Sequence, residues 1–201
     1  MAHTEPLPAT ALNSIARQIG ERRSLTGPMF AAVAPGAALS IAESFKVWML
    51  GVDALQQPPG RLATLARETG TWHHQINHGA QAREFARSVA AAVPPGAVAT
   101  GDMQLVELTP SPMAGRIGET IEWIDKNASG DPLARLLIVP AYYLVAFWLE
   151  QPNRDEIVVV DRPAQFESVH YFQIYEYPAF RDLLLGLPRP QGLPTTPPPP
   201  G

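Results

Sequence analysis

The chain has 201 residues, of which 46% are hydrophobic and 17% charged, with a formal net charge of −4. This composition is apolar enough to build one sizeable core and excludes a chain that is disordered throughout. The negative charge argues against nucleic acid or anionic lipid as a partner, and the absence of cysteine excludes disulfides, thiolate catalysis and cysteine-ligated metals.

Cellular location is inferred from two segments. Residues 1–8 lack a basic stretch followed by an apolar one, so we expect no secretory signal and a cytoplasmic protein. The most apolar run, residues 136–149, is interrupted by Pro140 and is shorter than the roughly 20 residues of a membrane helix. We therefore expect no membrane span. Two lysines against thirteen arginines favour a GC-rich bacterial source.

The first half of the chain is expected to mix helices and strands. Leu12, Ile15 and Ile19 lie at helical spacing and predict an amphipathic helix over 10–23 that ends near Gly20. Residues 37–55 fit a strand or a helix equally, so both remain open. The next predicted elements are a short helix over 61–68, a strand over 71–76, a turn at 77–79 and a helix over 81–93.

The second half carries a hairpin signal. The β-rich runs 136–149 and 157–160 flank the polar turn 151–155 and predict an antiparallel hairpin central to the core. Pro140 lacks a backbone donor, so we expect it at a bulge or an edge. The other predicted elements are a strand over 103–108, a loop over 110–118, a helix over 118–127, an alternating aromatic segment over 170–177 and a closing helix over 177–187.

These elements predict the fold class and the domain boundaries. Short strands and helices without a βαβ rhythm indicate a single α+β domain over 1–187, with a mainly antiparallel sheet and short flanking helices. Residues 188–201 contain seven prolines and are expected to form a disordered, polyproline-like tail.

The histidines are the first candidate site. His73, His74 and His78 lie within six residues and could serve a metal or a small hydrolase. A strand and turn would point His73 and His74 to opposite faces and place His78 beyond the bend, so we expect no metal site. Asp102 and Ser111 would complete a serine hydrolase trio by residue type, but no GxSxG elbow is present.

Other catalytic signals are weak. No glycine-rich phosphate loop is present, so we expect no nucleotide cofactor and predict no cofactor of any kind. Asp155, Glu156 and Asp161 flank the second strand of the hairpin, where charged residues are usually solvated strand ends.

The aromatic residues are the more suggestive signal. Neighbouring residues of a strand face opposite ways, so Tyr142 and Trp148 cannot share a core face with Phe147. Either both faces of the sheet are covered, or one row of aromatics faces a partner. On the second interpretation the binding residues are Tyr142, Trp148, Tyr171 and Tyr175.

Three functional hypotheses follow from these signals. The first is a non-catalytic accessory protein that holds a peptide or protein segment on a strand edge or aromatic face, for instance for a peptide-modifying or natural-product enzyme. The second is a small hydrolase or metal-dependent enzyme that uses the three histidines. The third is an obligate homo-oligomer whose aromatic face is only a subunit interface.

Overall fold

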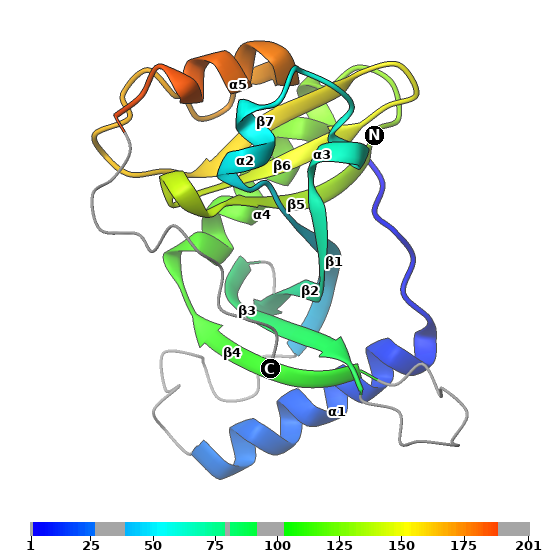
Figure 1. Ribbon diagram of the computed structural model, residues 1–201. Helices are drawn as coiled ribbons and strands as arrows, with labels where there is room; N and C mark the ends of the chain where they lie inside the picture. The colour runs from blue at the N-terminus through cyan, green and yellow to red at the C-terminus, as the bar shows by residue number, and fades with distance from the viewer. Residues whose placement is uncertain (1, 27–38, 79–80, 92–102, 189–201) are drawn as a thin grey trace.

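In the computed structural model, residues 2–26, 39–78, 81–91 and 103–188 are described (Figure 1). The predicted tail, apart from Pro188, lies outside these residues. The helices are α1 (Ala9–Thr26), α2 (Val52–Gln56), α3 (Leu62–Leu65), α4 (Pro112–Asn127) and α5 (Tyr177–Leu185), with a 3₁₀ turn at Pro140–Tyr142. The strands are β1 (Leu39–Met49), β2 (Arg67–His78), β3 (Gln81–Ala90), β4 (Met103–Pro110), β5 (Leu133–Val139), β6 (Leu144–Glu150), β7 (Asp155–Asp161) and β8 (Ile174–Glu176).

All these strands belong to one sheet in the order β4-β3-β2-β1-β5-β6-β7-β8. Strands β1 to β4 form an antiparallel meander, and β5 to β8 form a second one. The two meanders meet where β1 and β5 pair in parallel, with Val47 opposite Leu136. The sequence-based expectation of an α+β fold with a mainly antiparallel sheet is therefore confirmed.

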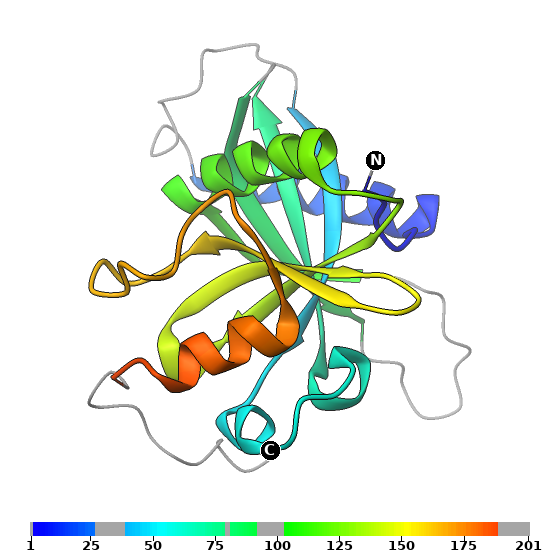
Figure 2. The ribbon, with the colours of Figure 1, turned by 90° about the horizontal axis from the view of Figure 1, so that it is seen from above.

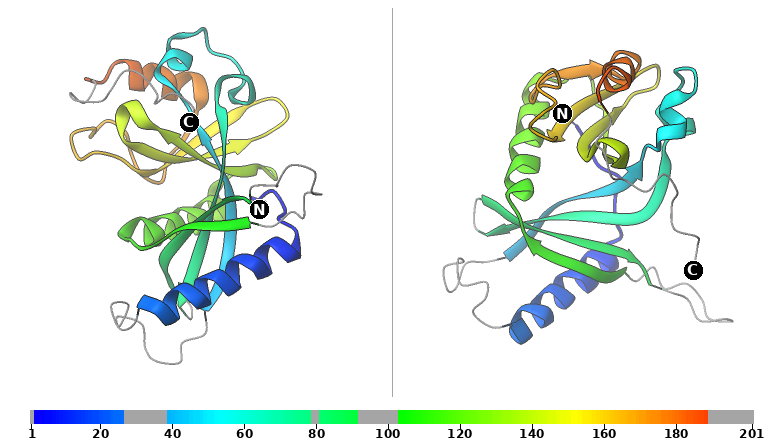
Figure 3. Two further views of the ribbon diagram at one scale, coloured as in Figure 1. Left: turned by 60° about the horizontal axis from the view of Figure 1, so that its bottom comes forward. Right: turned by 60° about the vertical axis from the view of Figure 1, so that its left-hand side comes forward.

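Helices cover both faces of the sheet (Figures 2 and 3). Helix α4 packs Ile117, Ile121 and Ile124 on one face, against strands of both meanders. On the opposite face, α1 covers the first meander with Ala11 and Ile15, while α2, α3 and α5 cover the second meander. Because successive strand residues alternate, the central strands β5, β6 and β7 are apolar on both sides, whereas β2 buries the polar side chains of His73, His74 and Gln75. Among the described residues, no helix has the length and apolar character to cross a membrane.

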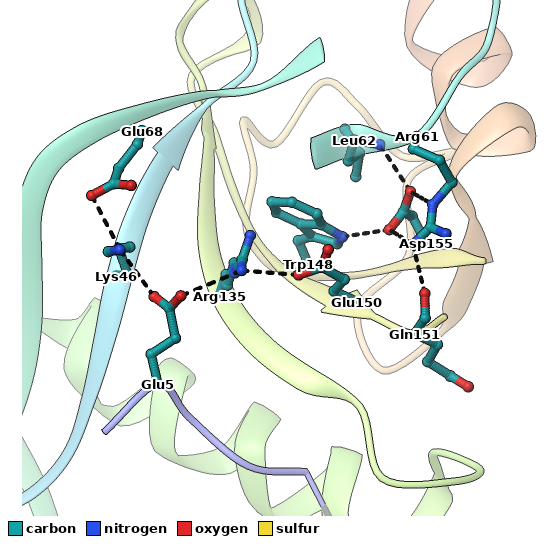
Figure 4. Close-up of polar contacts among 10 residues, drawn as sticks. All are labelled: Glu5, Lys46, Arg61, Leu62, Glu68, Arg135, Trp148, Glu150, Gln151 and Asp155. Atoms are coloured by element: carbon teal, nitrogen blue, oxygen red, sulfur yellow. Dashed lines mark hydrogen bonds and ion pairs between the residues drawn. The ribbon is translucent and has the colours of Figure 1, made fainter. Parts of the chain in front are cut away.

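A chain of charges joins the N-terminal segment to the face that α1 partly covers (Figure 4). Glu5 pairs with Lys46 at 3.4 Å and with Arg135 at 3.4 Å. Arg135 also pairs with Glu150 at 3.0 Å, and its guanidinium lies 4.7 Å from the ring centroids of both Trp48 and Trp148. On this face, ion pairs and cation–π contacts thus lie between the apolar cluster under α1 and the apolar cluster under α2, α3 and α5.

The predicted helix over 81–93 is wrong, because residues 81–90 form strand β3. Both edges of this segment hydrogen-bond to neighbouring strands, β2 on one side and β4 on the other. Phe85 stacks on His73 toward α4, and Ala86 packs beneath α1. The alanines of this segment favour a helix, but helix propensity is a weak preference, and pairing with a strand on each side outweighs it.

The predicted strand over 136–149 is two strands. Pro140 opens the 3₁₀ turn, and Tyr143 follows in the left-handed conformation with φ 49°. The chain reverses at this point, so β5 and β6 pair with each other. Proline suits the first position of such a turn because its φ is fixed and its missing N–H is not needed there. The predicted hairpin is confirmed between β6 and β7, closed by the hydrogen bond from Gln151 N–H to the Arg154 carbonyl at 3.0 Å.

Two predicted boundaries also shift. Helix α1 continues through Gly20 to Thr26. Helix α4 starts at Pro112, inside the predicted loop 110–118, because the Ser111 side chain accepts a hydrogen bond from Met113 N–H at 3.2 Å and caps the helix. Of the segment 37–55, residues 37 and 38 lie outside the described residues, and the rest contains strand β1 followed by the start of α2.

Candidate functional site

Two of the four predicted binding aromatics lie in the core. The Tyr142 side chain is 1% exposed and packs on Phe166, and Trp148 is 0% exposed. The interpretation of these two residues as a surface row needs correction, since α2, α3 and α5 cover the sheet face on which they lie. Those helices come from two chain segments outside the β6–β7 hairpin, 52–65 and 177–185, so strand alternation alone could not reveal the cover.

The other two predicted aromatics lie next to β8. Tyr175 is buried, and its hydroxyl accepts a hydrogen bond from His170 N–H at 2.7 Å, which fixes the end of the loop before β8. Tyr171 is 38% exposed, and the Arg162 guanidinium lies 4.9 Å from its ring centroid. Among the four predicted residues, Tyr171 alone is exposed.

Phe172 extends this exposed region. It is 45% exposed, has φ 53° and lies 6.1 Å from the Trp123 ring of α4. A bulky residue in the left-handed region is strained, and such strain often occurs at functional sites. We call Trp123, Arg162, Tyr171 and Phe172 the β8 aromatic surface. Sequence analysis did not single out Phe172 and Trp123, because no pattern encodes a left-handed backbone for phenylalanine.

A strand edge adjoins the β8 aromatic surface. Strand β8 is the last strand of the sheet, and in the part of the chain that the structure describes it pairs with β7 alone. Phe172 precedes Ile174, the first residue of β8, by two positions. The free backbone groups of an edge strand can accept an additional strand. The aromatic rings and the edge therefore lie where one extended ligand could contact both.

Two arginines near the β8 aromatic surface, Arg116 and Arg162, differ in whether a carboxylate in the described part of the chain neutralises them. Arg116 of α4 pairs with Asp161 at 3.0 Å. Arg162 instead donates to the carbonyls of Pro163 at 3.1 Å and Ala164 at 3.4 Å, and no carboxylate of the described residues forms an ion pair with it. A guanidinium stacked on a ring and lacking an ion-pair partner favours an acidic group on a ligand.

His74 is buried on the face of the sheet that α1 covers. Its Nδ1 lies 2.8 Å from Ser44 Oγ and its Nε2 lies 2.7 Å from Ser88 Oγ, so the imidazole bridges β1 and β3. Burial lowers the pKa of His74 to about 4, because the charged form loses its hydration. The imidazole is therefore neutral near pH 7, with both nitrogens occupied.

His73 is buried on the opposite face, as the strand prediction required. Its ring stacks on Phe85 at 4.8 Å, and its Nε2 lies 3.3 Å from Gln75 Oε1. Burial lowers its pKa to about 3. The side chain of His78 and all of Asp102 lie outside the described residues, and Ser111 caps α4. Within the described ranges, no group of three or more metal-ligating side chains comes together.

The three hairpin carboxylates each have a cationic partner. Asp155 accepts from Arg61 Nε at 2.8 Å and from Leu62 N–H at 2.8 Å, which anchors α3 to the hairpin (Figure 4). Glu156 pairs with Arg154 at 3.2 Å. Asp161 pairs with Arg116, as described above. These contacts give the carboxylates structural roles.

The fold and the surface together define a class: an α+β protein with one mixed eight-stranded sheet, covered on both faces, and an aromatic surface beside one sheet edge. Comparison of the chain with protein-family models, curated proteins and solved structures gives no match in any of the three.

Proposed function

We propose that this protein is a non-catalytic binding module that holds an extended peptide or protein segment along the edge of β8. Strand β8 has only three residues, so the segment adds few main-chain hydrogen bonds to its free side, and the contacts of its side chains with the β8 aromatic surface supply the rest of the binding. The observation that carries the proposal is Phe172, a strained and exposed aromatic ring beside a free strand edge.

The chemistry of the surface specifies the segment further. Tyr171 and Phe172 offer rigid aromatic area, which binding surfaces favour because little side-chain entropy is lost. Arg162 stacks on Tyr171 and forms no ion pair with the described part of the chain, which favours an acidic residue on the segment. The expected ligand is therefore an extended segment with an apolar residue next to an acidic one.

The burial of His73 and His74 favours this proposal over a histidine-dependent enzyme. A catalytic base must reach the proton that it removes, and both imidazoles are 0% exposed. Their ring nitrogens contact serine or glutamine side chains, except Nδ1 of His73, for which the described residues provide no hydrogen-bond partner.

The test is selection of a random twelve-residue peptide display library on the purified protein, followed by calorimetric titration of the enriched peptides. Phe172→Ala should weaken binding of the selected peptides about 30-fold or more, since truncating a central aromatic contact typically costs at least about 2 kcal/mol. Tyr143→Ala is the matched control, because Tyr143 is also exposed and also has positive φ but lies in the β5–β6 turn.

The outcomes separate the hypotheses. Enrichment of peptides that depends on Phe172 and not on Tyr143 supports the proposal. Failure to enrich any peptide, or equal binding to the Phe172→Ala variant, refutes it. A concentration-dependent dimer that Phe172→Ala dissociates would instead assign the surface to a second copy of the chain.

A further inference from the structure

The opposite edge of the sheet, strand β4, has an unusual neighbour. In the described part of the chain β4 pairs with β3 alone, so its outer backbone groups face away from the sheet. Helix α1 crosses beside this strand (Figures 1 and 3). Gln18 of α1 reaches the outer edge: its Nε2 donates to the Met103 carbonyl at 2.7 Å, and its Oε1 accepts from Leu105 N–H at 2.9 Å.

These two hydrogen bonds have the geometry of strand pairing. A residue of a parallel neighbouring strand donates to the carbonyl of one residue and accepts from the N–H two residues later. The Gln18 carboxamide does the same at Met103 and Leu105, and a carboxamide carries the same donor and acceptor as a peptide group. Gln18 therefore takes the place of one residue of an added strand.

The position of Gln18 is fixed by its helix. Ile15 and Ile19, on either side of it, are 0% and 3% exposed and pack in the cluster that contains Met103 and Leu105. Gln18 Nε2 also lies 3.2 Å from Ser14 Oγ, one helical turn earlier. The carboxamide is thus held against β4 by burial of its neighbours.

The rest of the β4 edge lacks the usual protection against pairing. Val106 is 46% exposed. Glu107, the one charged residue of β4, pairs with Arg87 of β3 at 3.3 Å, so it offers no unpaired charge. Edge strands are commonly protected by unpaired charges or prolines, and Pro110 stands only at the far end of this strand. Two copies of β4 would meet without charge repulsion.

We propose that the outer edge of β4 is a docking surface for β4 of a second copy of the chain, and that Gln18 keeps this surface closed. With Gln18 in place, the free edge is limited to 106–109, which is shorter than a typical strand of about five or six residues. Loss of the carboxamide extends the free edge back to Met103. This inference concerns the sheet edge opposite β8 and is independent of the proposed peptide binding.

The experiment compares variants of the full chain by sedimentation velocity over a hundredfold range of concentration. Gln18→Met retains the length and helix propensity of the side chain but cannot form the two hydrogen bonds. It should convert a monomer into a concentration-dependent dimer, with the self-association constant increased at least tenfold. Arg17→Ala is the matched control, since Arg17 is an exposed neighbour whose hydrogen bond and ion pair join it to Glu21 of the same helix.

A second substitution tests whether the copies associate through the outer edge of β4. Adding Val106→Lys to Gln18→Met should restore the monomer, because two lysines would face each other across the paired edges. A Gln18→Met variant that remains monomeric throughout the range overturns the proposal. It is also overturned if the double variant associates equally well, or if association accompanies loss of helical circular dichroism, since exposed core would then drive it.

Discussion

The indole N–H of Trp148 donates a hydrogen bond of 2.9 Å to Oδ1 of Asp155, a carboxylate whose side chain is 2% exposed. The Trp148 ring lies in the core, on the sheet face that α2, α3 and α5 cover. Strand alternation is compatible with Trp148 at the surface, but the structure places it in the interior. This hydrogen bond joins β6 to β7, and Asp155 also accepts from Arg61 and Leu62 N–H of the chain segment that carries α3. Stability should depend on this pair.

Trp148→Ala should destabilise the protein as severely as Phe147→Ala. Both side chains are 0% exposed, on opposite faces of β6, and truncation of a buried aromatic typically costs about 3–5 kcal/mol. Equilibrium unfolding in urea measures both values. A loss below 1 kcal/mol for Trp148→Ala would mean that its face is open, and the surface interpretation of Trp148 would return.

Arg61→Ala should destabilise the protein by about 2 kcal/mol, because it removes a charged donor from the buried Asp155 carboxylate. The loss should be smaller than for a fully buried ion pair, since the Arg61 side chain is 39% exposed and Leu62 N–H and the Trp148 indole still donate to Asp155. Arg17→Ala, which removes an exposed pair with Glu21, should change the stability by less than about 0.5 kcal/mol. Thermal and urea unfolding distinguish the two, and equal effects would contradict a central role for Asp155.

Stability should fall as the pH is lowered from about 6.5 toward 4. The folded pKa values of His74 and His73, about 4 and about 3, lie below the unfolded value of 6.5. In this window the unfolded chain binds protons that the folded chain does not, so acidification favours unfolding. His73→Phe should reduce the slope, because a phenyl ring can replace the imidazole against Phe85 and does not titrate. Urea midpoints measured from pH 7 to pH 4 give both slopes, and an unchanged slope in the variant would contradict the assignment.

Glu43 should have the opposite effect on the pH dependence of the stability. Burial raises its pKa, with further contributions from the negative charges of Asp125 and Glu122. A folded pKa above the unfolded value means that the folded state binds the proton more tightly, so this group favours folding as the pH falls. Glu43→Gln should therefore steepen the loss of stability on acidification. A shallower loss in that variant would show that Glu43 is stabilised as a carboxylate.

Phe172→Gly should be more stable than Phe172→Ala by about 1 kcal/mol, because glycine adopts positive φ without the steric cost that alanine bears. Tyr171 provides the control, since its φ is not positive and glycine there should be less stable than alanine. Chemical unfolding of the four variants gives the two differences. The same sign at both positions would refute backbone strain at Phe172.

Sequence patterns alone determined the elements whose signal is local. The apolar spacing of α1 and α5, the alternation in β2 and β4, and the turn between β6 and β7 were all readable from neighbouring residues. The same reasoning placed His73 and His74 on opposite faces of one strand, as the structure has them. It failed at β3, where alanines in helical register form a strand because β2 and β4 pair with both of its edges.

Only the tertiary structure decided which surfaces are covered. The parallel pairing of β1 with β5 brings together segments about 90 residues apart, and the helices that bury Trp148 come from two distant parts of the chain, α2 and α3 from one and α5 from the other. Hydrophobic burial depends on which segments meet in space, and period-two alternation is the same for a face under a helix and a face in water. For that reason the sequence singled out Tyr142, Trp148 and Tyr175 together with Tyr171, whereas the structure leaves only Tyr171 of these four exposed, next to Phe172 beside the edge of β8.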